Sequence, residues 1–288
     1  MRKPFSDTNH LKIVCSSIIL GDIVENLSQG VAEVRIINGT PGSPDEVSYG
    51  QSDLELLRHC DLFIRFDRDT EPWTDSFISL ANRADLPVYT INNGSRRIAP
   101  DITVLAEFVP DNPPRSTAVH GFAQTLDPFI VLGWIGTLTE RLIHCSPNRA
   151  ELILKNAQSY SQRISQLHKK YTENISRLSL SNYFAIGDTM RYLSDRYNFH
   201  CLRAVYPPDT TDDIQTFITA LAEQMNQKHC SVLIVPPYCS ARFMRLLKKQ
   251  KSFSVICIDC FGDYHSIQRD SYLNIMEHNL RSLVQVFQ

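Results

Sequence analysis

The chain has 288 residues, of which 43% are hydrophobic and 21% charged, with a formal net charge of −2. This balance is typical of a globular protein, and it excludes nucleic-acid or anionic-membrane binding through a strongly basic surface. The sequence contains no run of about 18 apolar residues, so we expect no transmembrane helix and no integral membrane protein.

The first half of the chain alternates between short apolar runs and amphipathic stretches. Predicted strands lie at residues 12–15, 31–37, 61–66 and 87–91, and predicted helices lie between them at 17–27, 52–57 and 73–84. Strands that alternate with helices at this spacing indicate βαβ units and a mostly parallel sheet. Residues 95–118 contain four prolines and are predicted to form a loop, after which a helix begins at Asp127 and runs to about His144.

A long helix is predicted at residues 146–179. Ser146 can cap its start through the side-chain oxygen, and Pro147 occupies a first helical position, where its missing N–H costs nothing. Apolar residues then recur in steps of three and four, which keeps them on one helix face. The periodic residues are Ile153, Ala157, Tyr160, Ile164, Leu167, Tyr171, Ile175 and Leu178. Periodicity alone is compatible with a surface or coiled-coil helix, or with a rigid helix that joins two lobes.

After the long helix the alternation restarts. Predicted strands lie at residues 183–186, 201–205, 232–235 and 255–258, and predicted helices at 189–197, 211–227, 240–249 and 271–287. The predicted fold class is α/β, with two lobes that each hold a mostly parallel sheet flanked by helices, joined by one long backbone helix. The predicted boundaries are 1–145 for the first lobe, 146–180 for the linking helix and 181–288 for the second lobe. Ligands of such folds bind at the carboxyl ends of strands, here in a cleft between the lobes.

The cysteines and the N-terminus give weaker information. Of eight cysteines, only Cys257 and Cys260 form a CxxC pair, and a structural zinc site of this type needs a second pair. Most of the eight are therefore expected to be small core residues. Residues 1–7 lack the apolar region of a signal peptide, which leaves open a cytosolic protein or a mature form whose export segment has been removed.

Several segments, in chain order, resemble those of a known family. They are PGSPD at 41–45, SDL at 52–54, EPW at 71–73, LDP at 126–128, SPNRA at 146–150, NAQSY at 156–160 and SYLNIMEHNL at 271–280. In this order they resemble the metal-binding receptors of zinc and manganese ABC importers. Those receptors are extracytoplasmic solute-binding proteins with two α/β lobes and one long connecting helix.

The resemblance implies a metal site, although most of its usual ligands are replaced here. The family uses three histidines, or two histidines and a glutamate, together with one aspartate. The histidine positions fall on Asp45, on Ala123 and on Gly187, and the aspartate falls on Asp259. His120 lies three residues before Ala123 and is a possible replacement ligand. The predicted metal ligands are therefore Asp45, His120 and Asp259, for a divalent ion such as Zn²⁺ or Mn²⁺.

Each predicted ligand also has an ordinary structural interpretation. Asp45 follows a proline-rich loop and is compatible with a solvated loop acid. His120 is compatible with an ordinary loop histidine. Asp259 is compatible with a turn residue after a strand. The thiols that flank Asp259 are a further possible zinc ligand, but Cys257 and Cys260 do not share a strand face.

The function implied by the resemblance is that of the extracytoplasmic, periplasmic substrate-binding component of a divalent-metal ABC importer with an atypical site. Its partner would be the membrane permease of that importer, and we expect a monomer. The alternative is a degenerate family member that imports no metal and acts as a binding or interaction module. No nucleophile triad, phosphate loop or HExxH motif points to an enzyme. The family sometimes carries a disulfide in the second lobe, so an exported form is expected to pair some second-lobe cysteines.

Overall fold

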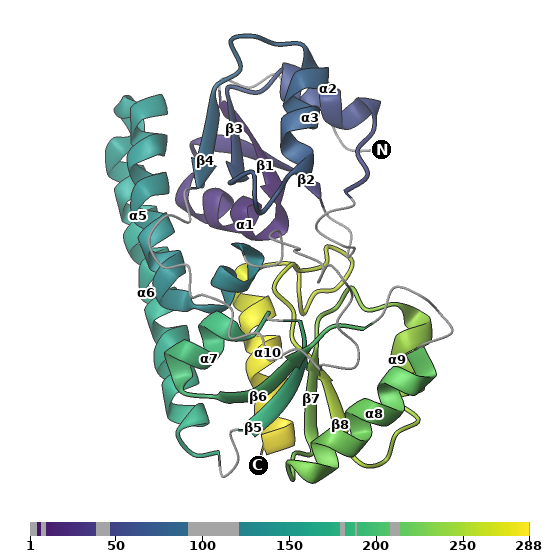
Figure 1. Ribbon diagram of the computed structural model, residues 1–288. Helices are drawn as coiled ribbons and strands as arrows, with labels where there is room; N and C mark the ends of the chain where they lie inside the picture. The colour runs from purple at the N-terminus through teal and green to yellow at the C-terminus, as the bar shows by residue number, and fades with distance from the viewer. Residues whose placement is uncertain are drawn as a thin grey trace.

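The computed structural model describes residues 5–6, 10–38, 47–91, 121–178, 182–187, 189–207 and 214–287. The loop expected at 95–118 lies outside these residues. Two four-stranded sheets lie toward opposite ends of the molecule (Figure 1). The first has the order β2-β1-β3-β4 and the second β6-β5-β7-β8, and every pairing is parallel. The two α/β units predicted from the alternating pattern are confirmed.

The first sheet consists of β1 (Leu11–Ser17), β2 (Ala32–Asn38), β3 (Leu62–Phe66) and β4 (Val88–Ile91). The helices α1 (Ile18–Leu27), α2 (Gln51–Arg58) and α3 (Trp73–Ala81) cover its two faces.

Alternation along β1 explains how both faces of this sheet are buried. Ile13 and Cys15 belong to the core that includes α1, whereas Val14 belongs to the smaller core under α2 and α3. Successive strand side chains point to opposite faces, so a continuous apolar run fills both cores.

The long helix is present, with a different start from the predicted one. Residues Pro147–Arg149 form a 3₁₀ turn, and α6 (Ala150–Ile175) follows as one uninterrupted helix of 26 residues. The predicted apolar stripe is buried from Ile153 to Tyr171. The predicted cap is wrong: Ser146 makes no side-chain capping bond, because it lies in the tight turn where α5 (Pro128–Cys145) ends and the 3₁₀ turn begins.

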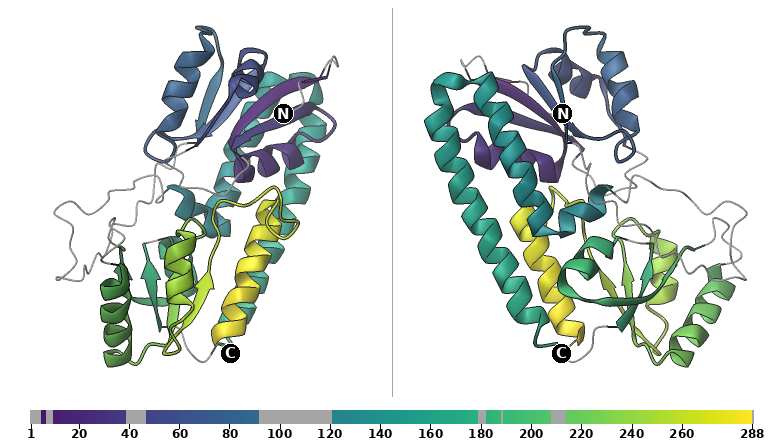
Figure 2. Two further views of the ribbon diagram at one scale, coloured as in Figure 1. Left: turned by 90° about the vertical axis from the view of Figure 1, so that its right-hand side faces the viewer. Right: turned by 60° about the vertical axis from the view of Figure 1, so that its left-hand side comes forward.

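Helix α6 runs past both sheets and packs against α5, α1 and α10 (Tyr272–Phe287) (Figure 2). The alternative of a helix that joins the two lobes is therefore confirmed. Tyr160 of α6 donates a hydrogen bond to Oδ2 of Asp22 on α1 over 2.7 Å, and Tyr171 donates to the carbonyl of Met276 on α10 over 2.6 Å. One helix is thus hydrogen-bonded to both lobes.

The second sheet consists of β5 (Asn182–Ile186), β6 (His200–Val205), β7 (Val232–Val235) and β8 (Ser254–Cys257). The helices α8 (Ile214–Gln227) and α9 (Ala241–Leu247) pack with one face of the sheet, and α6, α7 (Arg191–Tyr197) and α10 with the other. The core on the α6 side is continuous from Ile13 in the first lobe to Phe287 in the second. The boundaries predicted after residues 145 and 180 stay a prediction, since both lobes share this core.

All eight cysteines lie among the described residues, and all eight are free thiols. The pairing expected for the second lobe is therefore absent from the structure. Cys257 packs into the core under α8 and α9, whereas Cys260 is fully buried in the core on the opposite side. The two thiols of the CxxC pair thus face different cores, as the strand alternation predicts. In the described part of the chain, no helix combines the length and the apolar character needed to cross a bilayer.

Candidate functional site

The segments that follow β1 and β8 meet between the two lobes. Ile18 follows β1 directly, and Gly262 lies in the loop after β8. A Cβ atom placed on Gly262 would lie 3.1 Å from Cγ2 of Ile18, and the rings of Phe122 and Phe261 lie 4.8 Å apart between centroids. These contacts place the loop after β8 against the first lobe, at the position where parallel α/β folds bind ligands.

Asp259 lies two residues beyond β8 and is only 1% exposed. The buried Asn279 of α10 fixes its backbone: Asp259 N–H donates to Oδ1 of Asn279 over 2.9 Å, and Nδ2 of Asn279 donates to the Asp259 carbonyl over 2.6 Å. The carboxylate oxygen Oδ1 accepts from the N–H groups of Phe261 and Gly262 over 2.8 and 3.1 Å. The second oxygen, Oδ2, is 3.1 Å from Nη1 of Arg269. Both carboxylate oxygens therefore have partners within one loop.

Arg269 bridges two acids of this loop. Its Nη2 atom donates to Oδ2 of Asp263 over 2.9 Å, and its own carbonyl accepts from the N–H of Asp263 over 2.8 Å. The Arg269 side chain is 23% exposed, so the guanidinium lies at the edge of the buried Asp259. Burial lowers the pKa of His278 on α10, the positive charge of Arg269 lowers it further, and the charge of Asp259 acts in the opposite direction. The negative charge of Asp259 is thus balanced by the guanidinium of Arg269.

The other predicted ligands lie outside the described residues. Asp45 falls within 39–46 and His120 within 92–120. The structure therefore places one of the three predicted ligands, Asp259.

The remaining positions that carry histidine in the family are described. Ala123 is buried beside the 3₁₀ turn Gln124–Leu126. Gly187 follows β5 at φ +72°, and a Cβ atom placed on it would lie 3.8 Å from the hydroxyl oxygen of Tyr238 and 4.0 Å from Cε1 of Tyr206. Two tyrosines, from the loops after β7 and β6, thus flank the place where a third ligand would project.

Comparison with known proteins decides the family. The model of the family described as zinc-uptake complex component A, periplasmic, matches residues 13–286. The chain belongs to this zinc-uptake family. Members of this family are the substrate-binding components of divalent-metal ABC importers, so the chain is a transport receptor and not an enzyme. The family acts outside the cytoplasm, together with an ABC permease.

Individual relatives of the zinc-uptake family are distant in sequence. The manganese-binding lipoprotein MntA of Halalkalibacterium halodurans is 20% identical over 283 residues, which cover 96% of this chain and 89% of the relative. The iron-binding protein YfeA of Yersinia pestis is 23% identical over 201 residues, covering 68% and 60%. Among solved structures, the Zn(II)-bound ZnuA-like domain of Streptococcus pneumoniae AdcA superposes with a TM-score of 0.72 at 17% identity, covering 97% and 99%. This structural likeness shows the fold.

The described residues alone do not provide the ligand set expected in the zinc-uptake family. Within them, no three side chains of histidine, cysteine, aspartate or glutamate lie close enough together to hold a metal ion. Asp259 offers carboxylate oxygens, the ligand type that both Zn²⁺ and Mn²⁺ accept, but Arg269 already occupies one of them. Further ligands have to come from segments outside the described residues, as the predictions of Asp45 and His120 require.

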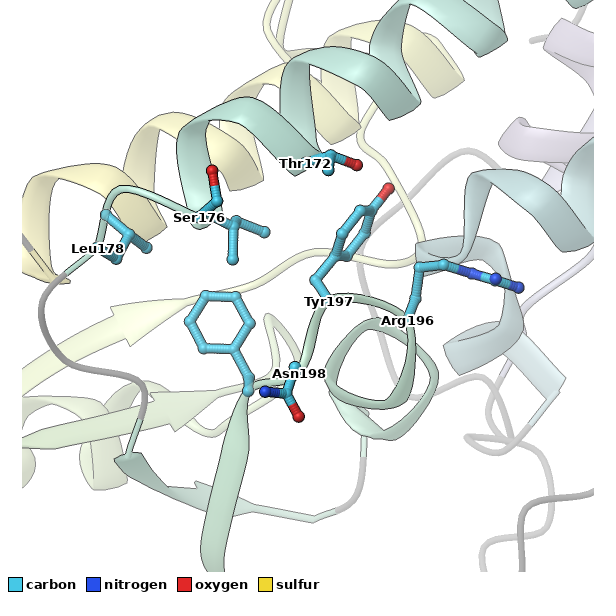
Figure 3. A pocket seen from close by; sticks show the side chains of 8 residues that line it. Thr172, Ser176, Leu178, Arg196, Tyr197 and Asn198 are labelled. Carbon is cyan, nitrogen blue, oxygen red and sulfur yellow. The ribbon is translucent and has the colours of Figure 1, made fainter.

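A separate cavity of about 460 Å³ opens between the end of α6 and the turn from α7 to β6 (Figure 3). It lies at the amino end of β6, whereas Asp259 follows the carboxyl end of β8, so the two are at opposite ends of the strands. Among the described residues that line it, none is an acid, a cysteine or a histidine, so they lack the ligand types that bind a divalent metal ion. The lining residues are Thr172, Ile175, Ser176, Leu178, Arg196, Tyr197, Asn198 and Phe199.

Sequence reasoning missed three side chains at the interlobe site. Tyr206 follows β6 directly, and Tyr238 lies three residues after β7, so both occupy the strand ends where the family places ligands. Their position just after predicted strands could have identified both tyrosines as candidate site residues. Arg269 follows Asp259 by ten residues in a loop without periodicity, and no pattern in the sequence predicts that the two side chains pair.

Proposed function

We propose that this receptor binds a divalent metal ion, zinc or manganese, at an atypical site that contains Asp259, with Asp45 and His120 as further ligands. The observation that carries the proposal is the position of Asp259. Its carboxylate is buried just beyond β8, where the two lobes meet, and two backbone N–H groups bind one of its oxygens. Asn279 fixes the backbone of the same residue.

The ligand types favour weaker zinc binding than a site with three histidines gives. Two carboxylates and one imidazole are harder ligands than three imidazoles, and Ala123 and Gly187 offer no side-chain donor. Water or another oxygen would complete the coordination shell. Oxygen ligands favour Mn²⁺ by type, although the general affinity order still favours Zn²⁺. Relatives of this chain include a manganese-binding, a zinc-binding and an iron-binding protein, which supports a divalent transition metal as the cargo.

The proposed working context follows from the family. The receptor would operate on the extracytoplasmic side, as a monomer, and deliver its metal to the membrane permease of an ABC importer. Both lobes contribute to the surface around the interlobe site, so either lobe can contact that permease.

One observation favours a second function, that of a family member that carries no metal. Arg269 supplies a positive charge 3.1 Å from Oδ2 of Asp259 and also bonds to Asp263. A site neutralised in this way is stable without a metal ion. The chain would then be an interaction module that keeps the fold of a metal receptor.

Metal titration by calorimetry separates these functions. Metal-stripped protein is expected to bind Zn²⁺ or Mn²⁺, and Asp259→Asn is expected to weaken that binding by about tenfold or more, because it removes the only charged ligand placed at β8. Asp270→Asn, in the same loop but bonded to Asn274, is the matched control and should bind as the parent protein does.

Two results would contradict the proposal. Tight zinc binding that survives Asp259→Asn would place the site elsewhere, with the thiols of Cys257 and Cys260 as the first residues to test. If none of the three proteins bound any divalent ion, the second function would be favoured. Circular dichroism melts of all three proteins check that the substitutions leave the fold intact.

A further inference from the structure

We propose that Arg269 is a tethered cation that competes with the imported metal ion for Asp259 and thereby lowers the metal affinity of this receptor. This inference rests on the proposed function, since it assigns a regulator to the same site. It differs from that function because it concerns a side chain that is not a metal ligand.

Arg269 is bonded to the one Asp259 oxygen that backbone N–H groups leave open. Asp259 has two carboxylate oxygens, and the N–H groups of Phe261 and Gly262 already hold Oδ1. The remaining oxygen, Oδ2, is the one that a metal ion would take, and Nη1 of Arg269 lies 3.1 Å from it. A metal ion cannot bind at Oδ2 along the same direction while this hydrogen bond is present.

Arg269 is anchored by Asp263 as well as by Asp259. Its Nη2 atom bonds to Asp263 over 2.9 Å, and its backbone carbonyl accepts from the N–H of the same residue. The Asp263 side chain is 14% exposed and the Arg269 side chain 23%, so the guanidinium is both anchored and close to solvent. It can leave Asp259 by turning outward without being buried elsewhere, and Asp263 can remain its partner.

A site that Arg269 occupies in part of the molecules has a lower apparent affinity for the metal ion. The observed dissociation constant equals the intrinsic one divided by the fraction of molecules whose site is free. A buried carboxylate paired with an arginine is a charge-assisted contact, so the free fraction is small. Removal of the guanidinium should therefore strengthen metal binding.

The same contact also explains how the loop keeps its shape without a metal. An unpaired carboxylate that is 1% exposed would be costly, and Arg269 offsets this cost in the metal-free protein. When a metal ion binds, it takes over the role of counter-ion. Arg269→Gln is therefore expected to be less stable than the parent protein without metal and to regain stability when metal is added.

The test is a calorimetric titration of metal-stripped protein with Mn²⁺ and with Zn²⁺, for the parent chain and for Arg269→Gln. The expected result is a dissociation constant lower by about tenfold or more in the variant. Arg269→Lys keeps the charge but loses the planar fork and should fall between the two. Thermal unfolding with and without metal gives a second measurement, and the metal-induced rise in Tm should be larger in Arg269→Gln.

Arg281→Gln is the matched control. Arg281 lies on α10, is exposed, and shifts the pKa of His278 in the same direction as Arg269 does, so its charge reaches the same region. Its Nε atom donates to the Glu277 carbonyl, on its own helix and away from Asp259. Removal of this charge should leave the dissociation constant nearly unchanged, which separates direct competition from a general change in net charge.

The possible outcomes are distinguishable. Equal affinities for the parent protein and Arg269→Gln, together with loss of binding in Asp259→Asn, would overturn the competition and leave the proposed function standing. Weaker binding in Arg269→Gln would show that Arg269 positions Asp259 for the metal, which also overturns the inference. If no variant binds a divalent ion, the proposed function fails and the inference fails with it.

Discussion

Replacement of Asp127 by alanine is expected to lower the free energy of unfolding by about 3 kcal/mol, near the low end of what is typical when one partner of a buried ion pair is removed. Asp127 is 4% exposed and caps α5, since its Oδ1 accepts from the N–H of Phe129 over 2.9 Å. Arg196 of α7 binds both of its oxygens, with Nε and Nη2 each 2.9 Å from one of them. This pair bonds the start of α5 to the second lobe.

The substitution removes a helix cap and a bidentate pair together. Loss of the cap alone typically costs about 1 kcal/mol. Arg196 is 26% exposed and can turn toward water, which keeps the total near the low end. Urea unfolding followed by circular dichroism measures the change. Glu277→Ala, which breaks the exposed pair with Lys170, is the control and should cost less than about 1 kcal/mol. A change for Asp127→Ala as small as for this control would contradict the role of the pair.

The second large effect concerns the pH dependence of stability through Glu71. This carboxyl group is 1% exposed, and burial raises its pKa from 4.5 to about 7. The hydroxyl of Ser16 and the N–H of Phe66, which lies 2.9 Å from Oε2, act in the opposite direction without cancelling the effect of burial. The folded protein thus keeps a proton that the unfolded chain has already released.

The sign of the pH effect follows from this proton. Between pH 4.5 and about 7 the folded state binds more protons than the unfolded state, so stability falls as pH rises through this window. A shift of this size corresponds to about 3 kcal/mol at pH 8. Glu71→Gln keeps an acceptor for the Phe66 N–H and carries no charge. It should therefore match the parent protein near pH 4 and be more stable by up to about 3 kcal/mol at pH 8.

Unfolding by urea at several pH values between 4 and 8 measures this difference. Glu151→Gln, which removes an exposed carboxylate from the first turn of α6, should give the pH profile of the parent protein. If the Glu71→Gln curve ran parallel to the parent curve over the whole range, Glu71 would not hold a proton in the folded state at neutral pH.

The helices and strands were predictable because apolar residues recur along them at a regular spacing. The stripe from Ile153 to Tyr171 gave α6, since an apolar residue every three or four positions leaves one helix face to bury. The continuous apolar runs at β1 and β3 predicted buried parallel strands, because both faces of such strands are covered by helices. The start of α6 was not predictable to the residue, because Pro147 is equally compatible with the 3₁₀ turn that the chain adopts.

A residue of the site was predictable only where it comes directly after a predicted strand or helix. Asp259 was identified because it ends a strand, and its burial agrees with that position. Its partner Arg269 depends on the path of a loop that turns at Gly262 with φ +87°, and long-range pairing across such a loop leaves no periodic signal. Asp45 and His120 remain predictions because they lie in segments outside the described residues.

A crystal structure of the protein soaked with Mn²⁺ or Zn²⁺, with the ion located by anomalous scattering, would show directly whether a metal replaces Arg269 at Asp259. We expect one ion between the lobes, with Oδ2 of Asp259 about 2.0–2.2 Å from it if it is zinc, and the Arg269 guanidinium turned away toward Asp263 and solvent. An ion bound at another place, or an Arg269 side chain still bonded to Asp259 in the metal-loaded protein, would contradict this expectation.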